Sequence, residues 1–244
     1  MKQAGTWTNV IEYIDRIRPG FAQRIRPASP EQISRLESVI GRRLYPPYRE
    51  YLEHIGDCDD DVFLASSAFS ETIEHVIERS IELRDEECGP SFFEHFLRIG
   101  AATTQAYGVH VSGSEAGRVV ILDGCEADTR YDHISDSLLN FTFHAGFIHE
   151  LHQLSSQFAL ISADSHHENE ILRFLNSEYR AELYCDSANW FGRNNGVLVY
   201  ARLRRGSIDI GFTARALAQA IECAERAAQA LRLSKPRIED FLEP

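Results

Sequence analysis

The stretch SPEQISRLESVI, residues 29–40, decides how the first half of this chain folds. It predicts a helix with a defined start, because Ser29 supplies an N-cap hydroxyl, Pro30 suits the first helical position and Gln32 is placed to close a capping box. Gly41 supplies the C-terminal stop. Between these signals the apolar residues recur at helical spacing: Ile33, Leu36, Val39 and Ile40.

Three further helices are predicted around this one. The first covers Trp7 to Ile17, where apolar residues fall at helical spacing until Pro19-Gly20 ends the run. Pro46-Pro47 forces an extended turn, and a helix follows at residues 48–55. The last covers Glu71 to Glu87, where apolar residues repeat against a charged face, so its outer side is expected to be strongly negative.

Beyond Gly89-Pro90 the chain changes to short runs rich in β-branched residues. Such runs are typical of strands that alternate with turns. We therefore expect strands at residues 96–99, 108–111 and 118–122, and a weaker one at residues 140–143. A helix over residues 147–155 then completes an α+β unit.

The chain from Gln157 onward has a second α+β pattern. It begins with a predicted strand at residues 158–161 and a predicted helix at residues 166–179. Trp190 and Phe191 are assigned to a loop, and Asn194-Asn195-Gly196 to a tight turn. The remaining elements predicted here are three strands and a closing helix, at residues 181–185, 197–203, 207–212 and 214–233.

These elements define the fold class. We predict an α+β protein in which a mixed, mostly antiparallel sheet is packed by helices and is followed by a second small α+β unit. A length of 244 residues suits one large core or two smaller ones, and the repeated pattern favours two. We assign residues 1–155 to the first domain and residues 156–244 to the second.

The negative charge of the chain is concentrated in one segment. Residues 50–97 hold 14 acidic and two basic residues, so the net charge of this segment, −12, equals that of the whole chain. A field of this sign repels the phosphates of nucleic acid and attracts a cationic partner. The alternative is a well-solvated acidic surface that has no partner.

Several classes of function are disfavoured by the sequence. No apolar run approaches the roughly 20 residues of a membrane span and the polar N-terminus lacks a signal peptide, so we expect a cytoplasmic protein with no membrane partner. The five cysteines lie far apart, which favours reduced thiols. No cofactor or metal is expected, because Val62 stands where a calcium loop starting at Asp57 needs glycine, and His166 and His167 diverge on a helix.

Five short motifs occur in a defined order over residues 7–154. The opening set is ASPEQISRLE at residues 28–37, Ile40-Gly41, Leu44 and YREYL at residues 48–52. Farther on, FLRIG at residues 96–100 precedes the predicted strands and the apolar helix. In order and spacing these motifs resemble the SUKH superfamily, which includes fungal cell-wall-synthesis regulators and many bacterial toxin-immunity proteins.

The resemblance implies that the protein recognises other proteins and is not an enzyme. In the immunity branch of the superfamily the usual partner is a cognate toxin domain, often a nuclease. Surfaces that grip phosphate tend to be basic, so an acidic inhibitor complements them. Two alternatives stay open: a regulatory scaffold of the same fold without a toxin partner, and a hydrolase assembled from scattered polar residues.

The residues predicted to contact a cationic toxin domain follow from the position of the charge. They include one aromatic residue, Phe93, because large aromatic side chains favour the centres of interfaces. The alternative for Phe93 is a place at the edge of the core. The predicted partner-binding residues are Asp59, Asp60, Asp61, Glu82, Asp85, Glu86, Glu87 and Phe93.

Overall fold

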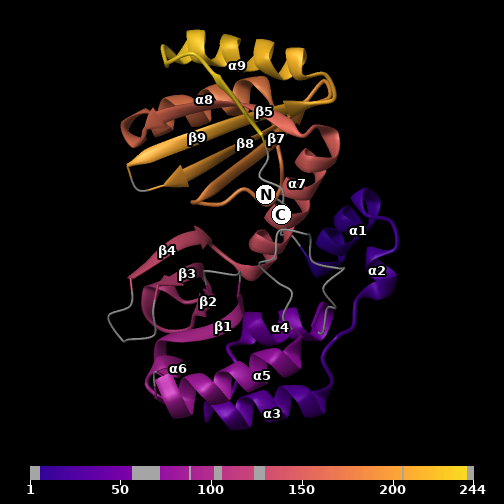
Figure 1. Cartoon of the computed structure of the whole chain (residues 1–244), viewed down its shortest axis with the longest axis vertical. Coiled ribbons are helices and arrows are strands. Elements are labelled where there is room, and N and C mark those ends of the chain that lie inside the picture. Colours follow the sequence, from indigo (N-terminus) through magenta and orange to yellow (C-terminus); the bar gives the residue numbers. More distant parts are fainter. Residues whose placement is uncertain are drawn as a thin grey trace. The chain divides into compact units, whose positions relative to one another are not determined.

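The computed structural model in Figure 1 gives an α+β protein. It describes residues 6–56, 72–87, 89–101, 106–123, 130–204 and 206–240. The chain divides into two compact units, Gly5–Ala145 and Gly146–Glu243. The sequence placed the boundary at residue 155, whereas this division falls within helix α7 (Leu138–Leu154).

The first unit begins with four helices. They are α1 (Trp7–Ile17), α2 (Phe21–Arg24), α3 (Pro30–Ile40) and α4 (Pro46–His54). The first and third have the predicted bounds, and the second was not predicted. The fourth starts at Pro46, so the extended turn predicted at Pro46-Pro47 is wrong and the two prolines form the first turn of a helix. The predicted capping box is confirmed: the Gln32 backbone N–H donates to Ser29 Oγ at 3.2 Å, and the Ser29 N–H donates to Gln32 Oε1 at 2.8 Å. Both bonds satisfy backbone donors that a helix start leaves open.

The next helical segment is less uniform than the sequence suggested. Helix α5 (Ile73–Glu82) starts at Thr72, whose hydroxyl accepts a hydrogen bond from the His75 N–H at 3.3 Å. It continues as a π-helical turn, η1 (Leu83–Glu87), and a short helix, α6 (Phe92–His95), follows. The apolar side of α5 is buried and the helix packs against α3.

The first unit also holds a four-stranded antiparallel sheet with the strand order β1-β2-β3-β4. Its strands are β1 (Phe96–Ala101), β2 (Ala106–His110), β3 (Val119–Asp123) and β4 (Arg130–Ser135). The three strands predicted from the sequence in this region are confirmed. Strand β4 was not predicted, because it carries no apolar alternation.

The strand predicted at residues 140–143 is wrong, because these residues belong to α7. The Ser137 hydroxyl accepts a hydrogen bond from the Asn140 N–H at 3.1 Å and so caps the first turn of this helix. A short apolar run does not by itself distinguish a buried strand from a buried helix. The cap at Ser137 is the signal that decides between them.

The second unit is built on a six-stranded antiparallel sheet with the order β10-β5-β9-β8-β7-β6. The two edge strands, β6 (Arg180–Ala181) and β10 (Arg237–Asp240), are short. The four inner strands are longer: β5 (Gln157–Asp164), β7 (Asn189–Asn194), β8 (Val197–Arg204) and β9 (Ser207–Ala214).

Two helices, α8 (Glu168–Glu178) and α9 (Leu217–Leu231), lie on one face of this sheet (Figure 1). A short 3-10 turn, η3 (Ser165–His167), leads into α8. The buried core between helices and sheet includes Ile171, Leu175, Val199, Ile210, Phe212 and Ala224. On the opposite face the Phe147 ring of α7 meets the Phe191 ring of β7 at a centroid distance of 4.8 Å.

Trp190 and Phe191 lie in β7 and are buried, so their assignment to a loop is wrong. A β carbon at Gly192 would lie 2.3 Å from Trp190 Cη2, so the strand accommodates the indole only because Gly192 has no side chain. The strand predicted at residues 181–185 is reduced to β6. The predicted turn is confirmed: Asn195 and Gly196 have φ angles of 47° and 78°, as a tight hairpin requires.

Candidate functional site

A row of carboxylates follows the outer side of α5 and η1. Glu74, Glu78 and Glu82 are four residues apart, and Asp85 continues the row into η1. Residues at this spacing share one side of a helix. The side chains of Glu74, Glu82 and Asp85 are 43%, 48% and 50% exposed. We call these four residues the acidic face.

The orientation of the acidic face is fixed by the buried, apolar side of α5. Ile73, Val76 and Ile77 of α5 are almost completely buried. They fix the rotation of the helix about its axis, so the carboxylates are directed to solvent as a set. The face is therefore part of a helix anchored in the core of the first unit and is not carried by a loop.

Arginines pair with three of the four carboxylates. Arg79 pairs with Glu82, and Arg84 pairs with Asp85 at 2.6 Å. The hydrogen bond from Arg84 lowers the pKa of Asp85 below its usual value. A third pair joins α3 to α5, because Arg35 Nη1 lies 2.6 Å from Glu74 Oε2. Glu78 forms no ion pair with any residue in the described ranges.

The structure brings together some of the predicted partner-binding residues. Glu82 and Asp85 lie on the acidic face, and Glu86 and Glu87 belong to η1. The predicted residues Asp59, Asp60 and Asp61 lie outside the described residues. Sequence reasoning missed Glu74 and Glu78, although they lie eight and four residues before Glu82, a spacing that predicts one side of a helix.

Phe93 does not contribute an aromatic surface. Its side chain is 1% exposed, and its ring packs edge-on against Phe92 at a centroid distance of 5.4 Å. Phe96 is buried beside them. The alternative reading of this cluster, a place in the core, is the one that the structure bears out.

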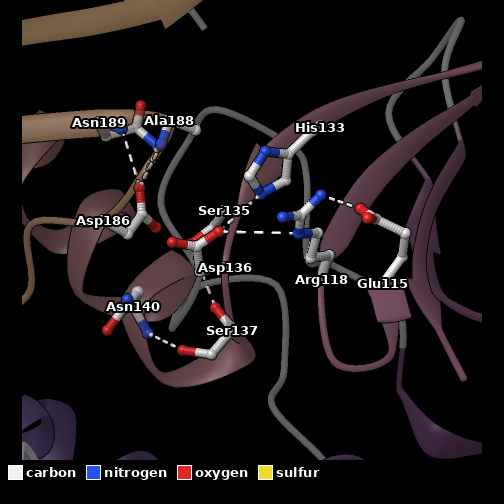
Figure 2. A network of polar contacts seen from close by, with 10 residues as sticks. All are labelled: Glu115, Arg118, His133, Ser135, Asp136, Ser137, Asn140, Asp186, Ala188 and Asn189. Carbon is white, nitrogen blue, oxygen red and sulfur yellow. Dashed lines mark hydrogen bonds and ion pairs between the residues drawn. The ribbon is translucent and has the colours of Figure 1, made fainter. Parts of the chain in front are cut away.

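A second charged group lies beside β3 and β4 of the first sheet, where Figure 2 shows it from close by. Arg118, just before β3, pairs with Glu115 of the 3-10 turn η2 (Gly113–Glu115), and its Nε lies 3.9 Å from Asp136 Oδ1. His133 Nε2 of β4 lies 3.2 Å from the same oxygen. These pairs tie η2 and the ends of β3 and β4 together, which indicates a structural role.

The described residues contain no group of three or more His, Cys, Asp and Glu side chains placed to hold a metal ion. The neighbouring rings of His166 and His167 lie 4.0 Å apart, each beside a carboxylate of its own: Asp164 at 4.0 Å from His166, and Glu170 at 3.5 Å from His167. Because each histidine faces a different carboxylate, the cluster does not converge on one point.

A hydrolase requires a nucleophile and a base at one hollow. In the second unit one hollow is lined by Cys223 together with Tyr179 and Arg226. The Arg226 guanidinium donates to Cys223 Sγ at 3.2 Å, and burial together with the nearby Cys223 raises the pKa of Tyr179. No histidine of the described chain lines this hollow, and the phenol of Tyr179, whose pKa is raised, stays protonated near neutral pH. The carboxylates of Glu178 and Glu222, which also line it, are the groups there that could accept a proton.

Comparison of the chain with protein-family models, with curated proteins and with solved structures finds no match. Within the part of the chain that the structure describes, no helix is both long enough and apolar enough to cross a membrane. The acidic face is the part of the predicted partner-binding site that the fold brings together, and it is therefore the candidate functional surface.

Proposed function

We propose that the chain is a non-catalytic protein-binding module whose first unit presents its acidic face to a cationic protein. The observation that carries the proposal is the row of four carboxylates on one side of a helix whose other side is fixed in the core. A preorganised row of like charges costs little ordering when a partner of opposite charge arrives.

The arginines on α3, α5 and η1 support this role. Arg35, Arg79 and Arg84 restrict the carboxylates they pair with, so the acidic face keeps a defined geometry. Exposed ion pairs of this kind contribute roughly 0–1 kcal/mol each to stability. The arginines also offset part of the charge of the three carboxylates they pair with. The uncompensated charge that would speed association with a cationic partner comes from Glu78 and from the excess of acidic residues in the segment 50–97.

The partner we propose is a toxin domain with a basic surface, and the protein would neutralise it in the cytoplasm as an immunity protein. The resemblance of residues 7–154 to the SUKH superfamily supports this choice. A toxin that cuts nucleic acid needs a basic groove for phosphate, and an acidic inhibitor can occupy that groove. A regulatory scaffold with a weaker cationic partner is the second candidate, because the same face would serve it.

The test is association with the C-terminal domains of toxins encoded beside the gene. Wild-type protein and the variant Glu78→Lys/Glu82→Lys are compared in pull-downs from native lysate and by stopped-flow at several salt concentrations. A matched control, Glu12→Lys/Glu225→Lys, changes two exposed glutamates of α1 and α9, neither of which belongs to the acidic face, by the same total charge.

We expect one toxin domain to bind wild type and the control in a salt-sensitive way, and to bind the acidic-face variant at least about tenfold more slowly. Equal association of all three proteins would refute the role of the acidic face. Capture of no toxin domain, in a lysate shown to contain them, would favour the scaffold.

A further inference from the structure

The second unit carries a hollow of about 690 Å³ that the acidic face does not explain. It is bounded by the end of α7, strands β6 and β7, the hairpin at Asn195-Gly196, and the start of α9. Three arginines and one carboxylate line it: Arg180, Arg193, Arg215 and Glu150. The hollow thus holds more positive than negative side chains, although the chain outside residues 50–97 is balanced in charge.

Arg193 is part of the wall of this hollow. Its guanidinium donates two parallel hydrogen bonds to Glu150, both at 3.1 Å, and a third to Glu182. Burial by itself lowers the pKa of Arg193, but the bonds to the two carboxylates outweigh it and raise the pKa. The guanidinium also lies over the Phe147 ring, 5.6 Å from its centroid. Two carboxylates therefore already compensate this cation.

Arg180 and Arg215 are different, because both are exposed and neither forms an ion pair with a described residue. Arg180 belongs to the edge strand β6, and Arg215 stands between β9 and α9. The hollow therefore keeps two guanidinium groups whose hydrogen-bond donors are available to a ligand. Guanidinium groups bind carboxylate and phosphate through paired N–H donors.

The start of α9 adds to the positive potential. Its N-cap is Ala216, which offers no side-chain cap, and no acidic residue stands in its first turn. The N-terminal end of a helix carries a partial positive charge and open N–H groups. Gln219 of this first turn lines the hollow, but its backbone N–H donates to Ala216 O and its side-chain amide donates to Asn195 O at 3.0 Å. The helix end therefore contributes its partial charge at this residue and not a free donor. The two arginines and the helix end thus favour the same sign of ligand charge.

The rest of the lining is neutral. Leu154 and Leu198 give it apolar walls, and Asn194 and Asn195 give it amide groups. The volume lies in the range of roughly 300–1,000 Å³ that is typical of small-molecule sites. We propose that this hollow binds a small organic anion, with Arg180 and Arg215 holding a phosphate or carboxylate group and the leucines contacting an apolar body.

The test is an NMR titration of the full chain with phenyl phosphate and benzoate, up to about 10 mM because a single ion pair with a small body gives weak binding. Inorganic phosphate and benzyl alcohol serve as probes that lack the apolar body or the charge. The variant Arg180→Gln/Arg215→Gln is compared with Arg173→Gln/Arg204→Gln, which removes two exposed arginines of the same unit that do not line the hollow.

We expect phenyl phosphate or benzoate to shift the amide signals of Asn195, Gly196 and Gln219 in wild type and in the control variant. The pocket variant should bind at least about tenfold more weakly, because it loses two charge-assisted contacts. The tighter of the two probes identifies the anionic group. Benzyl alcohol binding as well as the anions, equal affinity of the pocket variant, or the absence of shifts at these amides would each overturn the proposal.

Discussion

At Gly211 of β9 the fold leaves no room for a side chain. Gly211 lies directly opposite Tyr200 of β8, and the phenol ring folds across it. A β carbon at Gly211 would stand 2.1 Å from Tyr200 Cε1 and 2.6 Å from its Cζ, which no real structure permits. The pair fills one inner position of the second sheet, because the aromatic ring covers the space that the glycine leaves.

We predict that Gly211→Ala lowers the free energy of unfolding by roughly 1–3 kcal/mol, as overpacking of a filled site does. Urea denaturation followed by circular dichroism measures the change. In the background Tyr200→Ala the ring is absent, so adding the same methyl group should cost much less. An equal cost in both backgrounds would show that the ring is not the obstacle.

His110 of β2 gives the first unit a dependence on pH. Burial lowers its pKa below the usual value of about 6.5. A hydrogen bond with the Ser112 backbone opposes this shift, and electrostatic interactions with His95 and Arg118 add to it. The His110 ring packs edge-on against Phe96 at 4.8 Å. In the unfolded chain the pKa returns to about 6.5, so below that pH the unfolded state binds more protons than the folded state.

We therefore predict that stability is fully present above about pH 6.5 and falls as the pH drops toward the lowered pKa of His110. In His110→Gln this part of the loss should disappear, so the curve of unfolding free energy between pH 7 and 5 becomes flatter. Urea midpoints across this range measure it. A slope unchanged by the substitution would assign the pH dependence to other groups.

The role of a single residue could be predicted from the sequence where it depends only on near neighbours in the chain. Ser29 and Gln32 need only each other to form a capping box, and the structure has both bonds. Phe93 could not be placed by the same means, because burial depends on segments that fold over it. Its aromatic neighbours Phe92 and Phe96 were equally compatible with a surface anchor and with a core.

Helices and strands could be predicted from the sequence where the residues that determine them lie close together in the chain. Helices with caps and apolar stripes, such as α1 and α3, have the predicted ends. Strands β4, β7 and β10 were missed, because none has a clear apolar alternation of its own. Each forms by pairing with another strand: β4 with β3, β7 with β8, and β10 with β5. Strand formation depends on such distant partners more than on the residues of the strand itself.

The N-cap at Ser29 is expected to stabilise the start of α3. Ser29→Ala removes the acceptor for the Gln32 N–H and should lower the free energy of unfolding by roughly 1 kcal/mol. Ser34→Ala, an exposed site within the same helix, is the matched control and should be neutral or slightly stabilising. Chemical denaturation of both variants measures the difference. If Ser34→Ala costs as much as Ser29→Ala, the cap is not the cause.

The two candidate sites differ in how far the sequence alone could predict them. The acidic face lies on one helical segment, so half of it could be listed from residue order alone. The arginine-lined hollow could not be predicted, because Arg180 comes from β6, Arg193 from β7, and Arg215 from the link between β9 and α9. The sheet order that places β7 beside β6 gathers two of them in neighbouring strands.

The negative charge of the molecule is distributed unevenly along the chain. The net charge of −12 equals that of residues 50–97 alone, so the rest of the chain is balanced. An anion-exchange surface contacts the most negative side of a protein, and charge on other sides is largely screened beyond about 10 Å at 0.1 M salt. Retention should therefore depend on where a charge is changed and not only on the total.

We predict that Glu78→Lys/Glu82→Lys elutes at clearly lower salt than Glu168→Lys/Glu225→Lys, although each variant changes the net charge from −12 to −8. The second pair lies on α8 and α9, which belong to the second unit and carry no residue of the acidic face. Chromatography at pH 7 on one column compares both with wild type. Equal elution of the two variants would mean that retention follows the total charge, and the case for a directed cationic partner would then lose its electrostatic basis.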